Sequence, residues 1–131
     1  MITEQLYKQR GYFAIRETRI IDGDTIEATV ALPFGALARK RIRLRGWWTD
    51  EITGPYAECG LLARCKLYDF LEGKALWIHC PGERCDRYGR IVAHLVYKGQ
   101  LVDPKVVLGH LQLTETEHRA HRAAKAAVVV W

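Results

Sequence analysis

The sequence contains no apolar run long enough to cross a bilayer; its longest apolar stretch is the short one around Val128. Its N-terminal residues also lack an apolar core followed by a small-residue cleavage site. A membrane-spanning helix needs about 20 apolar residues, and a secretory signal needs such a core. We therefore expect a cytoplasmic protein with no membrane partner.

The sequence also lacks a C-x-x-C pair. Its four cysteines, Cys59, Cys65, Cys80 and Cys85, match no familiar zinc-ligand spacing. Inside a cell such cysteines are expected to be reduced thiols in the core rather than a disulfide framework. A zinc site that uses all four thiolates is the alternative.

Acidic residues do not balance the basic ones. The chain has 20 Lys and Arg against 15 Asp and Glu, which gives a formal net charge of +5. This excess permits a polyanionic partner such as nucleic acid. The length of 131 residues and the 49% hydrophobic content indicate one domain over residues 1–131, with polar residues 1–11 as an N-terminal arm.

A predicted strand near residue 40 separates two kinds of side chain. Ile42 and Leu44 alternate with arginines, so the apolar pair and the arginines are expected on opposite faces. The arginines are Arg39, Arg41, Arg43 and Arg45. Same-face neighbours lie ~6–7 Å apart, close to the phosphate spacing along one nucleic-acid strand. The face is either a solvated basic surface or a phosphate-binding one.

Hydrophobic periodicity and turn signals predict five strands and three helices. The strands are expected at 12–20, 25–32, 39–45, 74–80 and 91–97, and the helices at 56–71, 104–108 and 114–127. The first helix is expected to bury Ala57, Leu61, Cys65 and Tyr68, with Leu62 and Leu71 beside them. The order β-β-β-α-β-β-α-α predicts an α+β fold with a five-stranded OB-fold barrel.

Three motifs occur in a fixed order along the chain. They are the Ile21–Ile26 stretch IDGDTI, the pair Arg43 and Glu51 eight residues apart, and the Asp86–Arg90 stretch DRYGR. Together they resemble the staphylococcal nuclease-like (thermonuclease) family, and the resemblance covers roughly residues 12–109. It implies a five-stranded barrel with three helices. It also implies calcium-dependent cleavage of DNA and RNA that leaves 3′-phosphate ends.

The resemblance also implies a role for each matching residue. Arg43 and Arg90 would each donate paired hydrogen bonds to the phosphoryl oxygens, a geometry that lysine cannot reproduce. Glu51 would orient or deprotonate the attacking water. The metal would be held by the Asp24 carboxylate and the Thr49 carbonyl. Nucleic-acid contacts are expected from Arg87 and Tyr88, and from Arg41, Arg45 and Trp48.

The chain departs from the family pattern at one metal position. Trp48 replaces a second metal carboxylate, and Asp50 could supply a substitute by a turn of the loop. Loss of an acidic ligand weakens calcium binding, so Mg²⁺ or Mn²⁺ are alternative metals. The alternative function is an OB-fold module that binds single-stranded nucleic acid without catalysis. A third is a fold retained only for protein contacts.

Two histidines and two further tryptophans are also candidates for a site or for the core. His118 and His121 lie three residues apart on a predicted helix, beside Glu117. They could form a surface metal site, but we expect a solvated helix face. Trp47, like Trp48, could stack on exposed bases or plug the barrel mouth. Trp77 is expected in the core.

Overall fold

The structure is a computed structural model of the chain, and it describes residues 11–80 and 89–128. The described residues form two compact units. The strand unit contains residues 11–19, 25–45, 73–80 and 89–102, and the helix unit contains residues 20–24, 46–72 and 103–128. The expected N-terminal arm lies almost wholly outside the described residues, as do Arg87, Tyr88 and Cys85.

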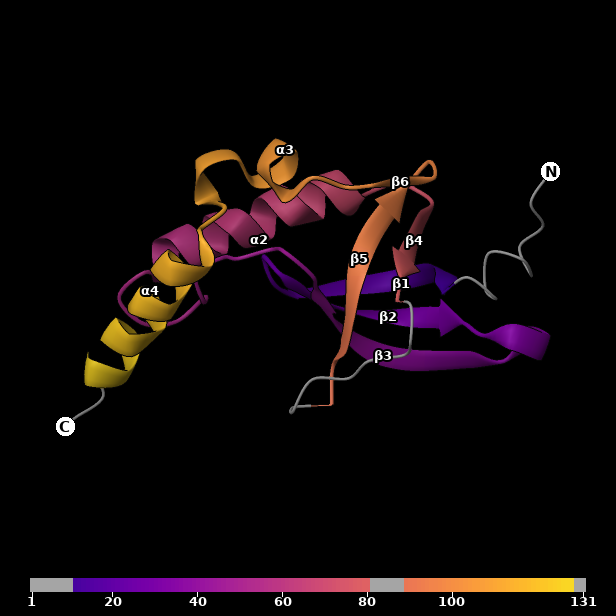
Figure 1. Cartoon of the computed structure of the whole chain (residues 1–131), viewed down its shortest axis with the longest axis horizontal. Coiled ribbons are helices and arrows are strands. Elements are labelled where there is room, and N and C mark those ends of the chain that lie inside the picture. Colours follow the sequence, from indigo (N-terminus) through magenta and orange to yellow (C-terminus); the bar gives the residue numbers. More distant parts are fainter. Residues whose placement is uncertain (1–10, 81–88, 129–131) are drawn as a thin grey trace. The chain divides into compact units, whose positions relative to one another are not determined.

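The strands form a single sheet that closes on itself (Figure 1). They are β1 (Tyr12–Asp22), β2 (Thr25–Ala31), β3 (Leu37–Leu44), β4 (Leu76–His79), β5 (Ile91–Tyr97) and β6 (Gln100–Leu101). The sheet order is β3-β2-β1-β4-β5-β6, and β3 also pairs with β5 in parallel. That pairing closes β1–β5 into a mixed barrel, so the predicted OB-fold barrel is confirmed.

The barrel core follows the alternation in the sequence. On β2, Ile26, Ala28 and Val30 are buried, and on β3 Ile42 and Leu44 are buried while the intervening arginines are not. Antiparallel pairing sets Ile26 opposite Ile42, which brings the two buried rows together. The predicted split between the two faces of β3 is therefore confirmed.

Strand β6 was not predicted. The Lys98–Gly99 turn, with positive φ at both residues, links β5 to a two-residue strand, and Tyr97 pairs with Gln100. Positive φ at both central positions is the geometry of a tight hairpin turn. Strand β6 is too short to show alternation, so periodicity cannot detect it.

The described residues include three α-helices, as predicted. They are α2 (Ala57–Leu71), α3 (Pro104–Leu108) and α4 (Glu115–Val128). Asp103 caps α3 by accepting the Lys105 N–H at 2.9 Å. At α4 the Thr114 and Glu117 side chains each accept the other's backbone N–H at 3.1 Å, so the predicted capping box is confirmed. None of the described helices is long and apolar enough to cross a membrane.

Helix α2 buries a different face from the one predicted. The buried residues are Gly60, Ala63, Leu67 and Leu71. Of the expected residues, Leu61, Leu62 and Tyr68 are 47%, 50% and 57% exposed, and Cys65 is exposed as well. The cause is a close backbone approach: a Cβ on Gly60 would lie 2.1 Å from the Glu51 carbonyl oxygen. The helix therefore turns Gly60 and Ala63 inward, and the prediction was wrong for Leu61, Leu62, Cys65 and Tyr68 but correct for Leu71.

Candidate active site

Two residues that precede α4 hold the loop after β3 through hydrogen bonds within the helix unit. The Gln112 side chain accepts the Trp48 N–H at 3.1 Å and donates to the Gly46 carbonyl at 2.8 Å. The Leu113 N–H donates to the Trp48 carbonyl at 2.8 Å. These bonds fix the backbone that presents Thr49, Asp50 and Glu51.

The two tryptophans of this loop have different environments. Trp47 is 1% exposed, so it is a core residue rather than a platform for bases. Trp48 is half-buried, and its indole lies 5.0 Å from the His118 ring in a tilted arrangement. His118 is itself buried.

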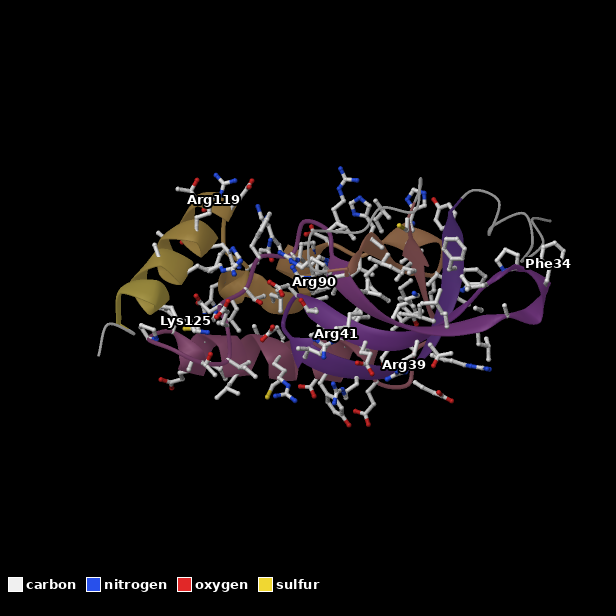
Figure 2. All side chains as sticks on the ribbon, turned by 90° about the horizontal axis from the view of Figure 1, so that it is seen from below. Phe34, Arg39, Arg41, Arg90, Arg119 and Lys125 are labelled. Carbon is white, nitrogen blue, oxygen red and sulfur yellow. The ribbon has the colours of Figure 1, made fainter. Side chains whose placement is uncertain are left out.

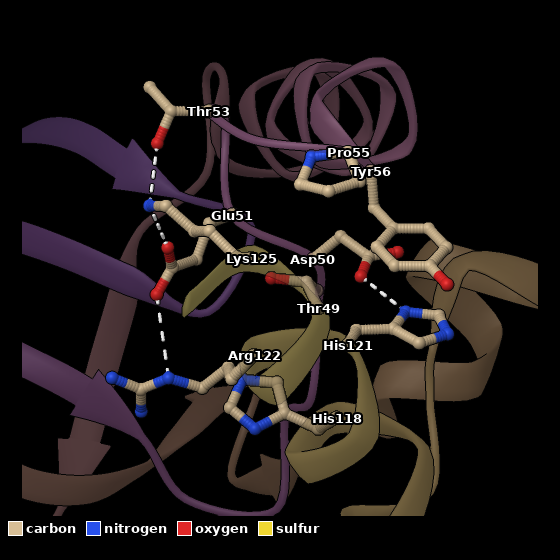
Figure 3. A pocket seen from close by; sticks show the side chains of 10 residues that line it. All are labelled: Thr49, Asp50, Glu51, Thr53, Pro55, Tyr56, His118, His121, Arg122 and Lys125. Atoms are coloured by element: carbon tan, nitrogen blue, oxygen red, sulfur yellow. Dashed lines mark hydrogen bonds and ion pairs between the residues drawn. The ribbon is translucent and has the colours of Figure 1, made fainter. Parts of the chain in front are cut away.

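Helix α4 supplies partners for both carboxylates of the loop (Figure 3). His121 Nδ1 lies 2.6 Å from Asp50 Oδ1, and Asp50 is buried. The His121 ring stacks on Tyr56 at 3.7 Å between centroids. A buried carboxylate needs such a partner because desolvation otherwise disfavours its charge. The expected solvated face for His118 and His121 was therefore wrong.

Glu51 is held by two cations of the same helix. Its Oε2 accepts from the Lys125 ammonium, and its Oε1 lies 3.5 Å from Arg122 Nε. Lys125 also donates to the Thr53 hydroxyl at 2.7 Å (Figure 3). The four α4 residues that face the loop are His118, His121, Arg122 and Lys125. Their i, i+3, i+4, i+7 spacing places them on one helix face, a signal that periodicity could have identified.

These side chains line a small pocket of about 10 Å³. That volume is close to the minimum that holds one water molecule. Thr49 also lines the pocket, and its hydroxyl is buried with no hydrogen-bond partner among the described residues. An unpartnered buried hydroxyl costs about 1–3 kcal/mol. Thr49 and Glu51 therefore line one pocket that has room for one water.

A second acidic group lies near Glu51 and was missed in the sequence. Burial raises the pKa of Asp22, and the negative charges of Asp24 and Glu51 raise it further, against Arg64 and Lys125. Asp24 Oδ2 accepts the Thr49 N–H at 3.3 Å, which brings those two predicted ligands together. The Asp22-Gly23-Asp24 spacing was the available signal. A Cβ on Gly23 would lie 2.7 Å from Ala63 Cβ, so the turn must be tight.

The donors suit a hard cation but are few. Asp22 and Asp24 offer carboxylate oxygens, whereas Asp50 is directed to His121. No group of three His, Cys, Asp or Glu side chains within residues 11–80 and 89–128 could by itself hold a metal ion. A cation with one or two carboxylate ligands completes its coordination with water and substrate phosphate.

The electrostatics of Asp22 give a testable result. A raised folded-state pKa means that this carboxyl stabilises the fold below its ordinary value of 3.8, and that the contribution is lost as pH rises through the folded-state pKa. Asparagine cannot ionise, so Asp22→Asn should raise the free energy of unfolding at pH 7 and change it little at pH 3. Urea unfolding at both pH values measures this. Asp69→Asn on the exposed side of α2 is the control, expected within about 0.5 kcal/mol of the parent. A less stable Asp22→Asn protein at pH 7 would contradict the account.

The predicted phosphate-binding arginines belong to the strand unit. Arg43 pairs with Val92 in the β3–β5 ladder, and Arg90 lies two residues before Val92. Arg90 therefore directly precedes β5, the strand that pairs with β3. Both are half-buried, and Arg43 Nη1 donates to the Leu44 carbonyl at 2.5 Å.

The other strand arginines differ in their partners. Arg39 Nε donates to Glu27 at 3.0 Å, its Nη1 donates to the Glu17 carbonyl at 2.5 Å, and Arg41 lies 3.8 Å from the same Glu27 carboxylate. The hydrogen bond from Arg39 is the main cause of a lowered Glu27 pKa. Arg39, Arg41 and Arg90 are labelled in Figure 2. Arg45 is exposed. Part of the arginine row is thus engaged within the strand unit.

Searches against protein-family models and curated proteins found no match to this chain.

Proposed function

We propose that the protein is a metal-dependent phosphodiesterase that hydrolyses DNA, RNA or both, as the thermonuclease resemblance implies. The observation that carries the proposal is the pocket that Glu51 and Thr49 both line, which has room for one water. A carboxylate beside a site for one water is what hydrolysis requires, because the water must lose a proton as it attacks phosphorus.

In this proposal each group has one task. The water occupies the pocket and Glu51 accepts its proton as the new O–P bond forms. The bond from phosphorus to the 5′-oxygen breaks, and the 5′-oxygen takes up a proton from solvent, so that a 3′-phosphate remains. Arg43 and Arg90 donate to the phosphoryl oxygens, on which negative charge increases. Lys125 and Arg122 hold the Glu51 side chain in one orientation.

Calcium is the proposed cofactor, with Mg²⁺ or Mn²⁺ as substitutes. Asp24 and the Thr49 carbonyl would hold it. Asp22 would supply the second carboxylate, which the family pattern has at the position of Trp48. When bound, the ion supplies positive charge that polarises the phosphoryl group. Partial neutralisation of Asp22, Asp24 and Glu51 would also relieve the repulsion that raises the Asp22 pKa.

A second function is favoured by one contact. Lys125 and Arg122 both pair with Glu51, so the carboxylate that hydrolysis would use is already engaged by two cations. A barrel that binds single-stranded nucleic acid without cleavage fits this contact.

The two functions are separated by one assay. Labelled single-stranded DNA and RNA are incubated with the protein in Ca²⁺, Mg²⁺, Mn²⁺ or chelator, and the product ends are analysed. We expect cleavage with a metal, none in chelator, and 3′-phosphate ends. Asp24→Asn should lower the rate by at least about tenfold, because a metal carboxylate is lost, whereas Asp69→Asn should not. Binding without cleavage under every condition would reject the enzyme and support the binding module.

A further inference from the structure

A larger pocket lies in the strand unit, and none of the site residues discussed above lines it. Its volume is about 380 Å³, within the range of small-molecule sites. Three aromatic side chains line it, those of Tyr12, Trp77 and Tyr97. Trp77, expected in the core, is instead half-buried on the pocket wall, so that prediction was wrong.

The sheet register explains why Trp77 faces a pocket. Leu76 and Ile78 are buried in the barrel, so Trp77 between them points to the outer face. Its ladder partners are Ala14 on β1 and Val96 on β5. Tyr12 lies two residues before Ala14 and shares its face.

The charged residues that line the pocket are both basic. Lys74 Nζ lies 5.9 Å and Lys98 Nζ 5.3 Å from the centroid of the Tyr97 ring. Such contacts hold ammonium groups at aromatic faces. The described lining contains no Asp or Glu. The pocket therefore combines flat aromatic walls with two like charges that an anion would bridge.

We propose that this pocket binds a nucleoside monophosphate unit, with the base against Trp77 and Tyr12 and the phosphate between Lys74 and Lys98. Aromatic side chains bind any base through its π-face, and ammonium groups bind phosphate. The unit could be a free nucleotide or one residue of a single strand. The inference is independent of the proposed hydrolysis, because no proposed catalytic or metal residue lines the pocket.

Calorimetric titration in chelator tests the proposal with four probes. These are AMP, adenosine, ribose 5-phosphate and an eight-residue oligo(dA). AMP should bind more tightly than adenosine or ribose 5-phosphate, and it should shift the Trp77 indole N–H signal in NMR spectra. If only the oligonucleotide binds, and its binding depends on Lys74 and Lys98, the site takes one nucleotide residue within a single strand.

A double variant, Lys74→Met with Lys98→Asn, removes both charges. Asparagine is chosen because Lys98 has φ of +51°, which asparagine tolerates. The Kd should rise about tenfold or more, as for the loss of a charged hydrogen bond. Lys40→Met on an exposed part of β3 removes a charge elsewhere in the strand unit and should leave the Kd unchanged. Absence of AMP and oligonucleotide binding, or equal binding by the double variant, would overturn the proposal.

Discussion

Arg90→Lys should lower the cleavage rate by about 10²–10³-fold, and Arg43→Lys should do the same. Both changes keep the positive charge, so binding of nucleic acid in chelator should change little. What lysine loses is the planar pair of donors that a phosphoryl group needs as its charge increases. Arg43 lies on β3 and Arg90 directly precedes β5, which pairs with β3, and this proximity along the ladder suits joint action on one phosphate.

The control for this experiment is Arg39→Lys, which changes another arginine of β3, the strand that carries Arg43. Arg39 bonds Glu27, Thr29 and the Glu17 carbonyl, so its guanidinium is engaged within the strand unit. Single-turnover cleavage with saturating protein separates the chemical step from binding. Equal rates for Arg90→Lys and the parent would remove Arg90 from the proposed mechanism, whatever happens to Arg43.

Gly60→Ala should destabilise the protein by about 2–3 kcal/mol, as overpacked sites do, and lower its Tm by roughly 10 °C. The sign is opposite to the usual one, because alanine inside a helix normally adds about 1 kcal/mol of stability relative to glycine. Here the new Cβ would lie 2.1 Å from the Glu51 carbonyl oxygen and 2.8 Å from the Asp50 carbonyl oxygen. These are backbone atoms, so the loop itself must move.

Thermal and urea unfolding measure this effect, with Cys59→Ala as the control. Cys59 is the preceding residue of α2 and is exposed, so alanine there should be neutral or slightly stabilising. Since the displaced atoms belong to Asp50 and Glu51, any cleavage activity should fall as well. A Gly60→Ala protein more stable than the parent would show that α2 does not approach the loop so closely.

The sequence predicted those features that depend on local chemistry. The Thr114 and Glu117 pair identifies the start of α4 because each side chain binds the other's backbone N–H. Alternation on β3 identifies Ile42 and Leu44 as core because strand side chains point to opposite faces. Such signals need no knowledge of distant residues, and the strand and helix order followed from them.

Features that depend on distant residues were not predicted. Hydrophobicity favoured Leu61 for the buried face of α2, but the approach of the loop backbone admits only a residue without a side chain, Gly60. His121 was interpreted as solvated because its partner, Asp50, lies 71 residues away in the sequence. Trp77 was assigned to the core because it lies on a strand, although its place between two buried residues directs it outward.

The contacts between α4 and the loop after β3 affect when the candidate site forms during folding. Two of these contacts join residues 71 and 74 positions apart, His121 with Asp50 and Lys125 with Glu51. Contacts so distant in sequence carry a large loop-closure entropy and form slowly. In a growing chain they cannot form until the ribosome has synthesised α4. In a growing chain the carboxylates of the candidate site therefore reach their final positions only after α4 has been synthesised.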